Sequence, residues 1–260
     1  AGGECLEWFG VLFRWLVPAG GIARSGNHMW DRKEPLAGEW LWITSRKTAD
    51  GAEPGGKNRM GSMLFRKAMP AGPVEYIVAG LGNPGKEYEG SRHNAGFMGM
   101  EALADRLHVK IDRVKFKSYC GQADIGGRRT LLLMPQTFMN LSGEAVREAM
   151  QFYKIPPERT VILFDDISLP VGTVRVRRKG SDGGQRGMKS IIYLTGSDQF
   201  PRVKIGVGAK PHPDYDLAAW VLSKFTKEEA PRIREAADHA AQAACLIVEG
   251  QIDEAMNRYN

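Results

Sequence analysis

The stretch GLGNPGKEYEGSRHNAG, residues 80–96, decides the fold of this chain. It follows the apolar run YIVAG, which is typical of a buried strand. Its first six residues fit the pattern G-x-G-x-x-G through Gly80, Gly82 and Gly85. The stretch therefore has two interpretations: a dinucleotide-binding turn, or a loop that carries a different kind of polar site.

A dinucleotide-binding turn requires a helix that begins within the glycine turn, and an acidic residue about 20 residues on, at the end of the second strand. Here Pro84 is followed by the long polar stretch KEYEGSRHN before apolar periodicity begins. The acid near the expected spacing, Glu101, falls inside a predicted helix. The pattern thus argues against an oxidoreductase with a nucleotide cofactor, and we expect no cofactor.

Composition sets broad limits on location and partners. The chain has 260 residues, 43% of them hydrophobic, and a formal net charge of +6, which favours an anionic partner such as nucleic acid. Its three cysteines, Cys5, Cys120 and Cys245, are far apart and predict neither a zinc site nor a disulfide framework. No apolar run reaches the roughly 18 residues of a membrane helix. We expect a cytoplasmic protein that does not enter a membrane.

The first part of the chain differs from the rest. Five of the six tryptophans precede residue 70, and residues 48–62 have the Gly-rich polar composition of a linker. We expect residues 1–72 to be an N-terminal extension that is non-native or disordered, and residues 73–260 to form the folded domain. The alternative is a small tryptophan-rich interaction segment. Mass spectrometry of protein made from the native locus distinguishes the two.

From residue 73 onward, strand and helix patterns alternate. Strands are predicted at residues 74–82, 128–136, 160–168, 172–180 and 202–208. Helices are predicted at residues 95–107, 143–155 and 188–196, and along the tail at 226–260, with Ser142 as a helix N-cap. The alternation predicts a single α/β domain with a twisted, mixed, mainly parallel sheet flanked by helices, including one antiparallel portion.

Candidate site residues follow the predicted strands. In the opening loop, the Asn83 carboxamide donates and accepts hydrogen bonds, Tyr88 stacks or hydrogen-bonds, and His93 transfers protons near neutral pH. The alternative for His93 is a helix-capping or surface histidine. Phe138 and Asn140 come directly after another strand. In open α/β sheets, ligands bind at the carboxyl ends of the strands.

The paired acids Asp165 and Asp166 end a third strand. No histidine or third carboxylate stands nearby in the sequence, so we expect no metal. An aspartate that orients a histidine needs only one of them; a turn or helix-cap aspartate is the alternative. Beyond them, RVRRKGSDGGQRG places Arg175 and Arg177 on one strand face, either as a solvated basic strand or as a track for RNA phosphates.

Taken together, these pieces resemble the bacterial peptidyl-tRNA hydrolase family. GLGNPGKEYEGSRHNAG, PQTFMNLSG, FDDISLPVG, GSDGGQRGMKS and RVKIGVG run in family order through residues 74–260, and residues 1–72 have no counterpart. The family hydrolyses the ester between a peptide and the terminal ribose of tRNA, which returns tRNA from stalled ribosomes to translation. The resemblance implies a monomeric enzyme that acts on peptidyl-tRNA without a metal, a cofactor or an obligate protein partner.

The resemblance also implies roles for individual residues. His93 corresponds to the general base that activates water, Asp165 to the partner that holds its imidazole, and Asn83 to the residue that recognises the blocked peptide end. Six further residues fall on tRNA-contacting positions of the family: Tyr88, Phe138, Asn140, Arg186, Arg177 and Lys204.

The chain departs from the family pattern at two places. Gln185 and Arg186 stand where the family usually has His and Asn, and Phe164 stands where many members have His. Arginine has no acceptor, so it does not replace every contact of an asparagine, although it can grip a phosphate. A catalytically weakened relative that binds structured RNA is therefore the alternative function.

Overall fold

The computed structural model describes residues 72–260. These residues belong to one compact unit, Met63–Asn260. The expectation for the N-terminal extension concerns residues that, apart from residue 72, lie outside the described range.

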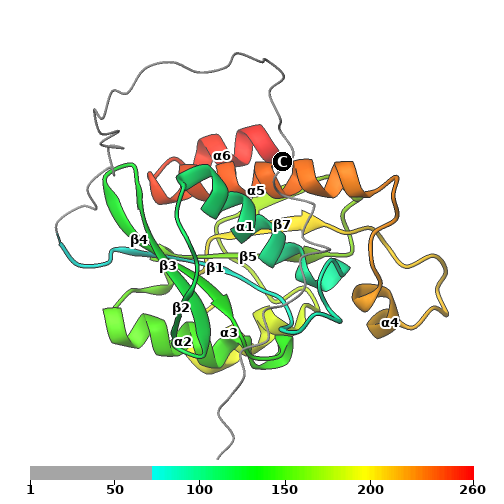
Figure 1. Cartoon of the computed structure of the whole chain (residues 1–260), viewed down its shortest axis with the longest axis horizontal. Helices are drawn as coiled ribbons and strands as arrows, with labels where there is room; N and C mark the ends of the chain where they lie inside the picture. The colour runs from blue at the N-terminus through cyan, green and yellow to red at the C-terminus, as the bar shows by residue number, and fades with distance from the viewer. Residues whose placement is uncertain (1–71) are drawn as a thin grey trace, which may run out of the picture. The chain divides into compact units, whose positions relative to one another are not determined.

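A seven-stranded mixed sheet forms the centre of the unit, with the order β2-β3-β4-β1-β5-β7-β6 (Figure 1). The four central strands β4, β1, β5 and β7 are parallel, and antiparallel pairs lie at both edges rather than in one portion. The strands are β1 (Tyr76–Gly80), β2 (Arg113–Lys115), β3 (Ser118–Ile125), β4 (Arg128–Pro135), β5 (Thr160–Asp166), β6 (Val174–Arg177) and β7 (Arg202–Gly206).

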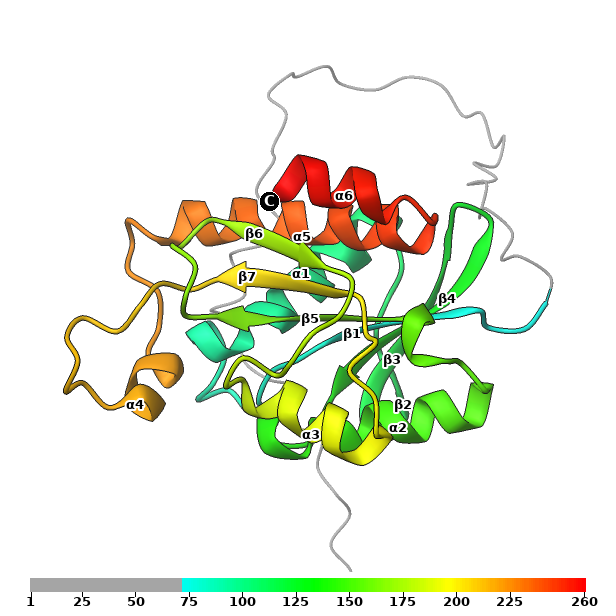
Figure 2. The same cartoon turned by 180° about the vertical axis from the view of Figure 1, so that it is seen from behind.

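Helices cover both faces of the sheet. In Figures 1 and 2, α1, α5 and α6 lie above the sheet, and α2 and α3 lie below it. The α-helices are α1 (Ala95–Leu107), α2 (Ser142–Tyr153), α3 (Arg186–Thr195), α4 (Leu217–Leu222), α5 (Ala230–Val248) and α6 (Ile252–Tyr259). Three short 3-10 helices are η1 (Arg92–Asn94), η2 (Met139–Leu141) and η3 (Pro157–Arg159).

Two hydrophobic cores, one on each face, explain the continuous apolar runs in the central strands. Along β5, Val161 and Leu163 pack into the core beneath α1 and α5, whereas Ile162 and Phe164 pack into the core of α2 and α3. Successive side chains of a strand point to opposite faces, and both faces are covered. The run TVILF therefore has no polar alternation.

Close packing between α1 and the end of β1 accounts for glycines of the opening stretch. A Cβ at Gly80 would lie 2.4 Å from the Gly96 carbonyl oxygen, and one at Gly82 would meet the Phe97 ring at 2.6 Å. A Cβ at Gly96 would lie 2.4 Å from the Leu81 carbonyl oxygen. These glycines let helix and strand backbones approach closely, rather than forming only a tight turn.

The predicted elements match the structure with few exceptions. α1 has the predicted bounds, and it begins well beyond the glycine turn. Ser142 is the first residue of α2 instead of its N-cap, which is Leu141, and its hydroxyl donates to the Met139 carbonyl at 2.9 Å. β2, β3 and α4 were not predicted. Among residues 72–260, no helix combines the length and the apolar character needed to cross a membrane.

Candidate active site

A pocket of about 400 Å³ lies at the carboxyl ends of the parallel strands, where α1 and α2 leave toward opposite faces of the sheet. Its walls come from the loops after β1, β4 and β5, from the loop before α3, and from α4. Seven of the nine predicted site residues line it: Asn83, His93, Phe138, Asn140, Asp165, Arg186 and Lys204.

The centre of the pocket is a buried pair formed by His93 and Asp165. The Nδ1 atom of His93 lies 2.8 Å from Oδ2 of Asp165. The two residues are 9% and 3% exposed, respectively. A carboxylic acid is a stronger acid than imidazolium, so the carboxylate accepts and Nδ1 carries the proton. The second ring nitrogen, Nε2, then has a lone pair and can act as a base.

A residue that the sequence analysis treated only as a departure completes this pair. Gln185 is 8% exposed, and its Nε2 donates to Oδ1 of Asp165 at 3.0 Å. Its Oε1 accepts from the Met188 backbone N–H at 2.7 Å, which makes Gln185 the N-cap of α3. Glutamine is not a preferred N-cap residue, and the contact with Asp165 has no local sequence signal either, so the sequence did not indicate this role.

Asn83 is fixed by two neighbours. The side chain of Asn94 accepts from the Asn83 backbone N–H at 2.8 Å and donates to its carbonyl at 3.0 Å. The Oδ1 atom of Asn83 accepts from the Met139 backbone N–H at 2.8 Å. Because Oδ1 is already bonded, the amide Nδ2 of Asn83 is the group that remains to donate to a ligand. Asn94, adjacent to His93, was not among the predicted site residues.

Aromatic and polar side chains form the rim of the pocket. Phe138 is 54% exposed, and its ring meets that of Tyr88 edge-on at 6.3 Å. Asn140 and Arg186 are also exposed. Tyr88 does not line the pocket itself but is linked to it through Phe138. The rim thus offers a ring face for stacking and a cation for an anionic group.

Lys204 forms an ion pair inside the pocket. Its Nζ lies 2.8 Å from Oδ2 of Asp166, whose Oδ1 accepts from the Ser168 hydroxyl at 2.6 Å. Burial acts to raise the pKa of Asp166, but the hydrogen bonds from Lys204 and Ser168 outweigh it and hold this pKa below its usual value. The ammonium of Lys204 therefore already has a carboxylate partner.

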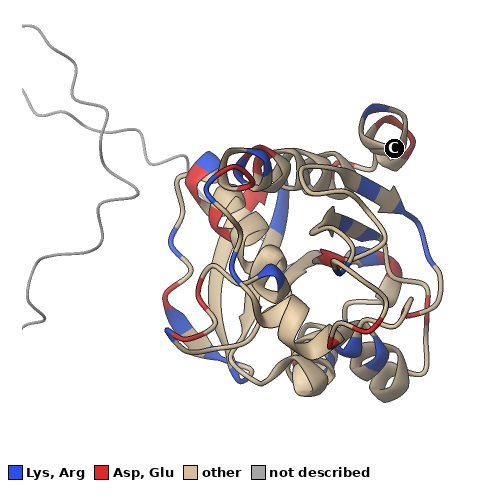
Figure 3. Cartoon of the chain, turned by 90° about the vertical axis from the view of Figure 1, so that its right-hand side faces the viewer, with Lys and Arg blue, Asp and Glu red and all other residues tan. Residues whose placement is uncertain are grey.

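The predicted basic strand is β6, at the edge of the sheet. Val174 and Val176 are buried whereas Arg175 is exposed and Arg177 half-buried, as the period-two pattern predicts. Arg177 lies outside the pocket, and its guanidinium donates to the Val176 carbonyl at 2.8 Å. Figure 3 shows Lys and Arg along the strands at this edge.

Comparison with known proteins identifies the family of this chain. The family model for peptidyl-tRNA hydrolase matches residues 77–260. The chain belongs to the peptidyl-tRNA hydrolase family. Peptidyl-tRNA hydrolases from Caldanaerobacter subterraneus and Alkaliphilus oremlandii are 55% and 51% identical to it over 185 residues, which is 71% of this chain and 99% of each relative. The crystal structure of peptidyl-tRNA hydrolase from Acinetobacter baumannii superposes with a TM-score of 0.68 at 36% identity, covering 72% of this chain and 94% of that one.

In this peptidyl-tRNA hydrolase, a buried arginine connects the histidine segment to the wall of the pocket. The Arg92 guanidinium forms two hydrogen bonds with the Glu229 carboxylate, at 2.7 and 3.1 Å, and donates to the Val207 carbonyl at 2.8 Å. It also stacks on the Trp220 ring at 3.8 Å. Arg92 belongs to η1 and directly precedes His93, so its stacking on Trp220 links η1 to α4, while its hydrogen bonds link η1 to the residues after β7 and before α5.

Within residues 72–260, no three His, Cys, Asp or Glu side chains gather in a way that could hold a metal ion. The two cysteines of this range are free. Burial raises the pKa of the Cys120 thiol to about 11, and that of Cys245 to about 11 as well. Neither thiol has the thiolate character of a nucleophile.

Proposed function

We propose that this peptidyl-tRNA hydrolase cleaves the ester between the peptide and the terminal ribose of tRNA with His93 as the general base and Asp165 as its orienting partner. The observation that carries the proposal is the 2.8 Å contact between His93 Nδ1 and Asp165 Oδ2 at the centre of the pocket. This contact orients the ring and leaves Nε2 to take a proton from water.

The reaction needs no covalent intermediate. Nε2 of His93 accepts a proton from water, and the hydroxide equivalent attacks the ester carbonyl carbon to form a tetrahedral intermediate. Collapse of the intermediate breaks the bond to the ribose oxygen, which takes the proton from His93 and leaves as the 3′-hydroxyl. The amide of Asn140 donates to the developing oxyanion, since an amide N–H aimed at growing negative charge lowers the barrier.

The peptide end is recognised by Asn83. Its Nδ2 donates to a carbonyl oxygen of the blocked amino group, while its Oδ1 stays bonded to the Met139 N–H. A free aminoacyl-tRNA has a protonated amine in place of this acyl carbonyl. The donor then finds no acceptor, and the substrate is disfavoured.

The terminal nucleotides of tRNA bind at the rim and along the basic edge. Tyr88 and Phe138 stack on a base, because every base offers a π face to an aromatic ring. Arg186 and Arg177 contact phosphate, and Lys204 joins them by exchanging its bond to Asp166 for a phosphate oxygen. This substrate arises on ribosomes, so we infer a cytoplasmic enzyme. Because a single chain supplies every residue of the mechanism, we also infer a monomer that needs no protein partner.

The test is release of an N-blocked amino acid from tRNA by the wild type and by His93→Ala. Loss of a general base lowers kcat by roughly 10²–10⁴-fold. A wild type no faster than His93→Ala would contradict the proposal and leave the RNA-binding alternative. Free aminoacyl-tRNA, run in parallel with Asn83→Ala, tests recognition of the peptide end: the variant should lose discrimination between the two substrates.

The same assay tests Arg186. If its guanidinium grips phosphate, Arg186→Asn raises KM with little change in kcat and lowers the salt dependence of KM by about one phosphate contact. A variant with much higher kcat than the wild type would instead show that arginine at this position slows the chemistry.

A further inference from the structure

The Asp165 carboxylate is held at both oxygens. Oδ2 lies 2.8 Å from Nδ1 of His93, and Oδ1 accepts from Nε2 of Gln185 at 3.0 Å. The pair is enclosed, because Asp165 is 3% and Gln185 8% exposed. A carboxylate with a donor at each oxygen cannot rotate about its Cβ–Cγ bond without losing both bonds.

The orientation of the Gln185 amide is itself determined by α3. Its Oε1 accepts from the Met188 backbone N–H at 2.7 Å, and a flipped amide would place NH₂ against that donor. Nε2 must therefore face Asp165. Its two hydrogens have two partners, Oδ1 of Asp165 and the sulfur of Met139 at 3.1 Å. Every polar atom of this amide is satisfied.

These bonds form part of a closed ring around the pocket floor. Met139 donates its backbone N–H to Asn83, and Asn94 binds the backbone of Asn83. Asn94 follows His93 in the chain, so the path returns to the base. The ring joins the loops after β1 and β4 and the end of β5 to the start of α3.

We propose that Gln185 is the positioning residue of the His93–Asp165 pair, transmitting the orientation of the α3 N-terminus to the base through a donor that does not titrate. Only the roles of His93 and Asp165 rest on the proposed function. An amide remains a neutral donor at every working pH, so Asp165 accepts at the same oxygen throughout. The fall of the rate at low pH, which is the acid limb of the pH–rate profile, therefore does not contain a titration of Gln185.

The clean test is Gln185→Asn. Asparagine is a preferred N-cap, so α3 keeps its cap, but the side chain is one methylene too short to cap Met188 and reach Asp165 together. We expect kcat to fall roughly tenfold, a part of the whole contribution of a general base, with KM unchanged. Without the donor, the carboxylate attracts a proton on the imidazole more strongly, so the fall of the rate on the acid side of the pH profile moves to higher pH.

Gln185→His supplies the rescue, because neutral imidazole offers one donor and one acceptor, as the amide does. Recovery of kcat near neutral pH, with thermal unfolding of all variants within a few degrees, supports the proposal.

A Gln185→Asn enzyme with wild-type kcat and acid limb overturns the proposal. The proposal is also overturned if Gln185→Asn lowers kcat without moving the acid limb and Gln185→His does not restore kcat, because the role of Gln185 is then structural. His93→Ala is measured in the same series. If the wild type is no faster than this variant, the proposed function itself has failed, and the results for Gln185 are then not interpreted.

Discussion

At the scale of single residues, adjacent carboxylates at the end of β5 have opposite surroundings. Asp165 is bound by a histidine and a neutral amide, whereas Asp166 is bound by a lysine and a serine. Alternation along the strand places them on different sides of the backbone. One is thereby suited to orient a base, and the other to hold a cation beside the pocket.

The ion pair of Asp166 predicts a pH-dependent part of the stability. Its pKa is lower in the folded protein than the usual value of about 3.9, so its contribution is fully present above roughly pH 5 and is lost as pH falls through the lowered value. The stability difference between wild type and Asp166→Asn should therefore be constant from pH 7 to about 5 and shrink below it. Urea unfolding at a series of pH values measures it.

Asp214, which is exposed on the segment before α4, is the control for this experiment. Asp214→Asn should leave the stability nearly unchanged at every pH, because exposed charges contribute little. A difference for Asp166→Asn that grows on acidification would contradict the sign of the predicted shift.

At the scale of elements, the first turn of α1 and the end of β1 are in direct backbone contact. Gly96 leaves no room for a Cβ, because the carbonyl oxygens of Leu81 and Leu163 would lie 2.4 and 2.5 Å away. Since His93 lies in η1 immediately before this turn, the contact sets the position of its imidazole relative to β5.

Gly96→Ala should therefore destabilise the enzyme by about 1–3 kcal/mol or more, because backbone atoms cannot yield to the added methyl. Gly99→Ala is the matched control in the same helix: its Cβ would meet side-chain atoms and no backbone, with the ends of Leu163 and Ile205 nearest, at 3.0 and 3.2 Å. The helix propensity gained by alanine, about 1 kcal/mol, offsets much of that strain. Equal losses of stability in chemical denaturation would contradict this reading of the contact.

The connection from η1 to α4 gives a second prediction at this scale. Burial acts against ionisation of Glu229, but the hydrogen bonds from Arg92 hold its pKa below the usual range. Glu229→Gln keeps the shape and removes the charge, so the nearly buried Arg92 loses its counter-ion. We expect a loss of about 1.5–3 kcal/mol and faster hydrogen exchange in residues 209–225.

Kinetics separate this effect from a general loss of stability. Because α4 forms one wall of the pocket, Glu229→Gln should change KM and kcat at temperatures where the variant is fully folded. Unchanged exchange in residues 209–225, together with unchanged kinetics, would show that Arg92 does not hold this wall.

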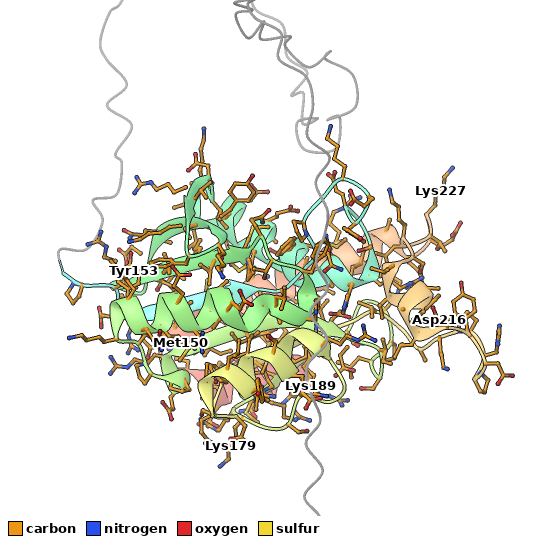
Figure 4. The ribbon with its side chains drawn as sticks, turned by 90° about the horizontal axis from the view of Figure 1, so that it is seen from below. Met150, Tyr153, Lys179, Lys189, Asp216 and Lys227 are labelled. Carbon is orange, nitrogen blue, oxygen red and sulfur yellow. The ribbon has the colours of Figure 1, made fainter. Side chains whose placement is uncertain are left out.

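At the scale of the whole molecule, charge determines how the enzyme meets a large anion. The net charge of the chain is +6, and basic residues stand on β6 (Arg175 and Arg177) and on α3 (Arg186 and Lys189). Lys179 and Lys189 extend from this side of the molecule, whereas Lys227 lies toward the opposite end (Figure 4). We therefore expect a polyanion such as tRNA to contact the β6 and α3 side of the fold.

Binding of tRNA to the His93→Ala variant should weaken steeply with salt, since each phosphate contact contributes about −0.7 to −0.9 to the slope of log K against log salt. Replacing Lys189 with Gln should reduce the slope by about one contact, whereas Lys227→Gln should not. Filter binding at several salt concentrations gives the slopes. A slope near zero would exclude phosphate contacts altogether.

Local sequence patterns predicted most of the fold and part of the site. The periodicity of residues 95–107 gave the bounds of α1, and the apolar run before Asp165 gave β5. The strands β2 and β3 were missed because Gly121 and polar residues interrupt their pattern, which is completed only by pairing with β4. For the site, sequence indicated which residue types follow the strands, and the resemblance assigned their roles.

By itself, the sequence determined the element order, the apolar faces and the placement of His93, Asp165 and Asn83 at or after strand ends, because these depend on side-chain period and on residues close in the chain. No local pattern placed His93 beside Asp165, 72 positions away: the family resemblance implied this contact and the tertiary structure shows it. Only the tertiary structure decided that Gln185 holds the second oxygen of the carboxylate. The reason is physical: strand order and helix packing bring the strand ends together, and no local pattern contains the distance between residues that meet only across a sheet.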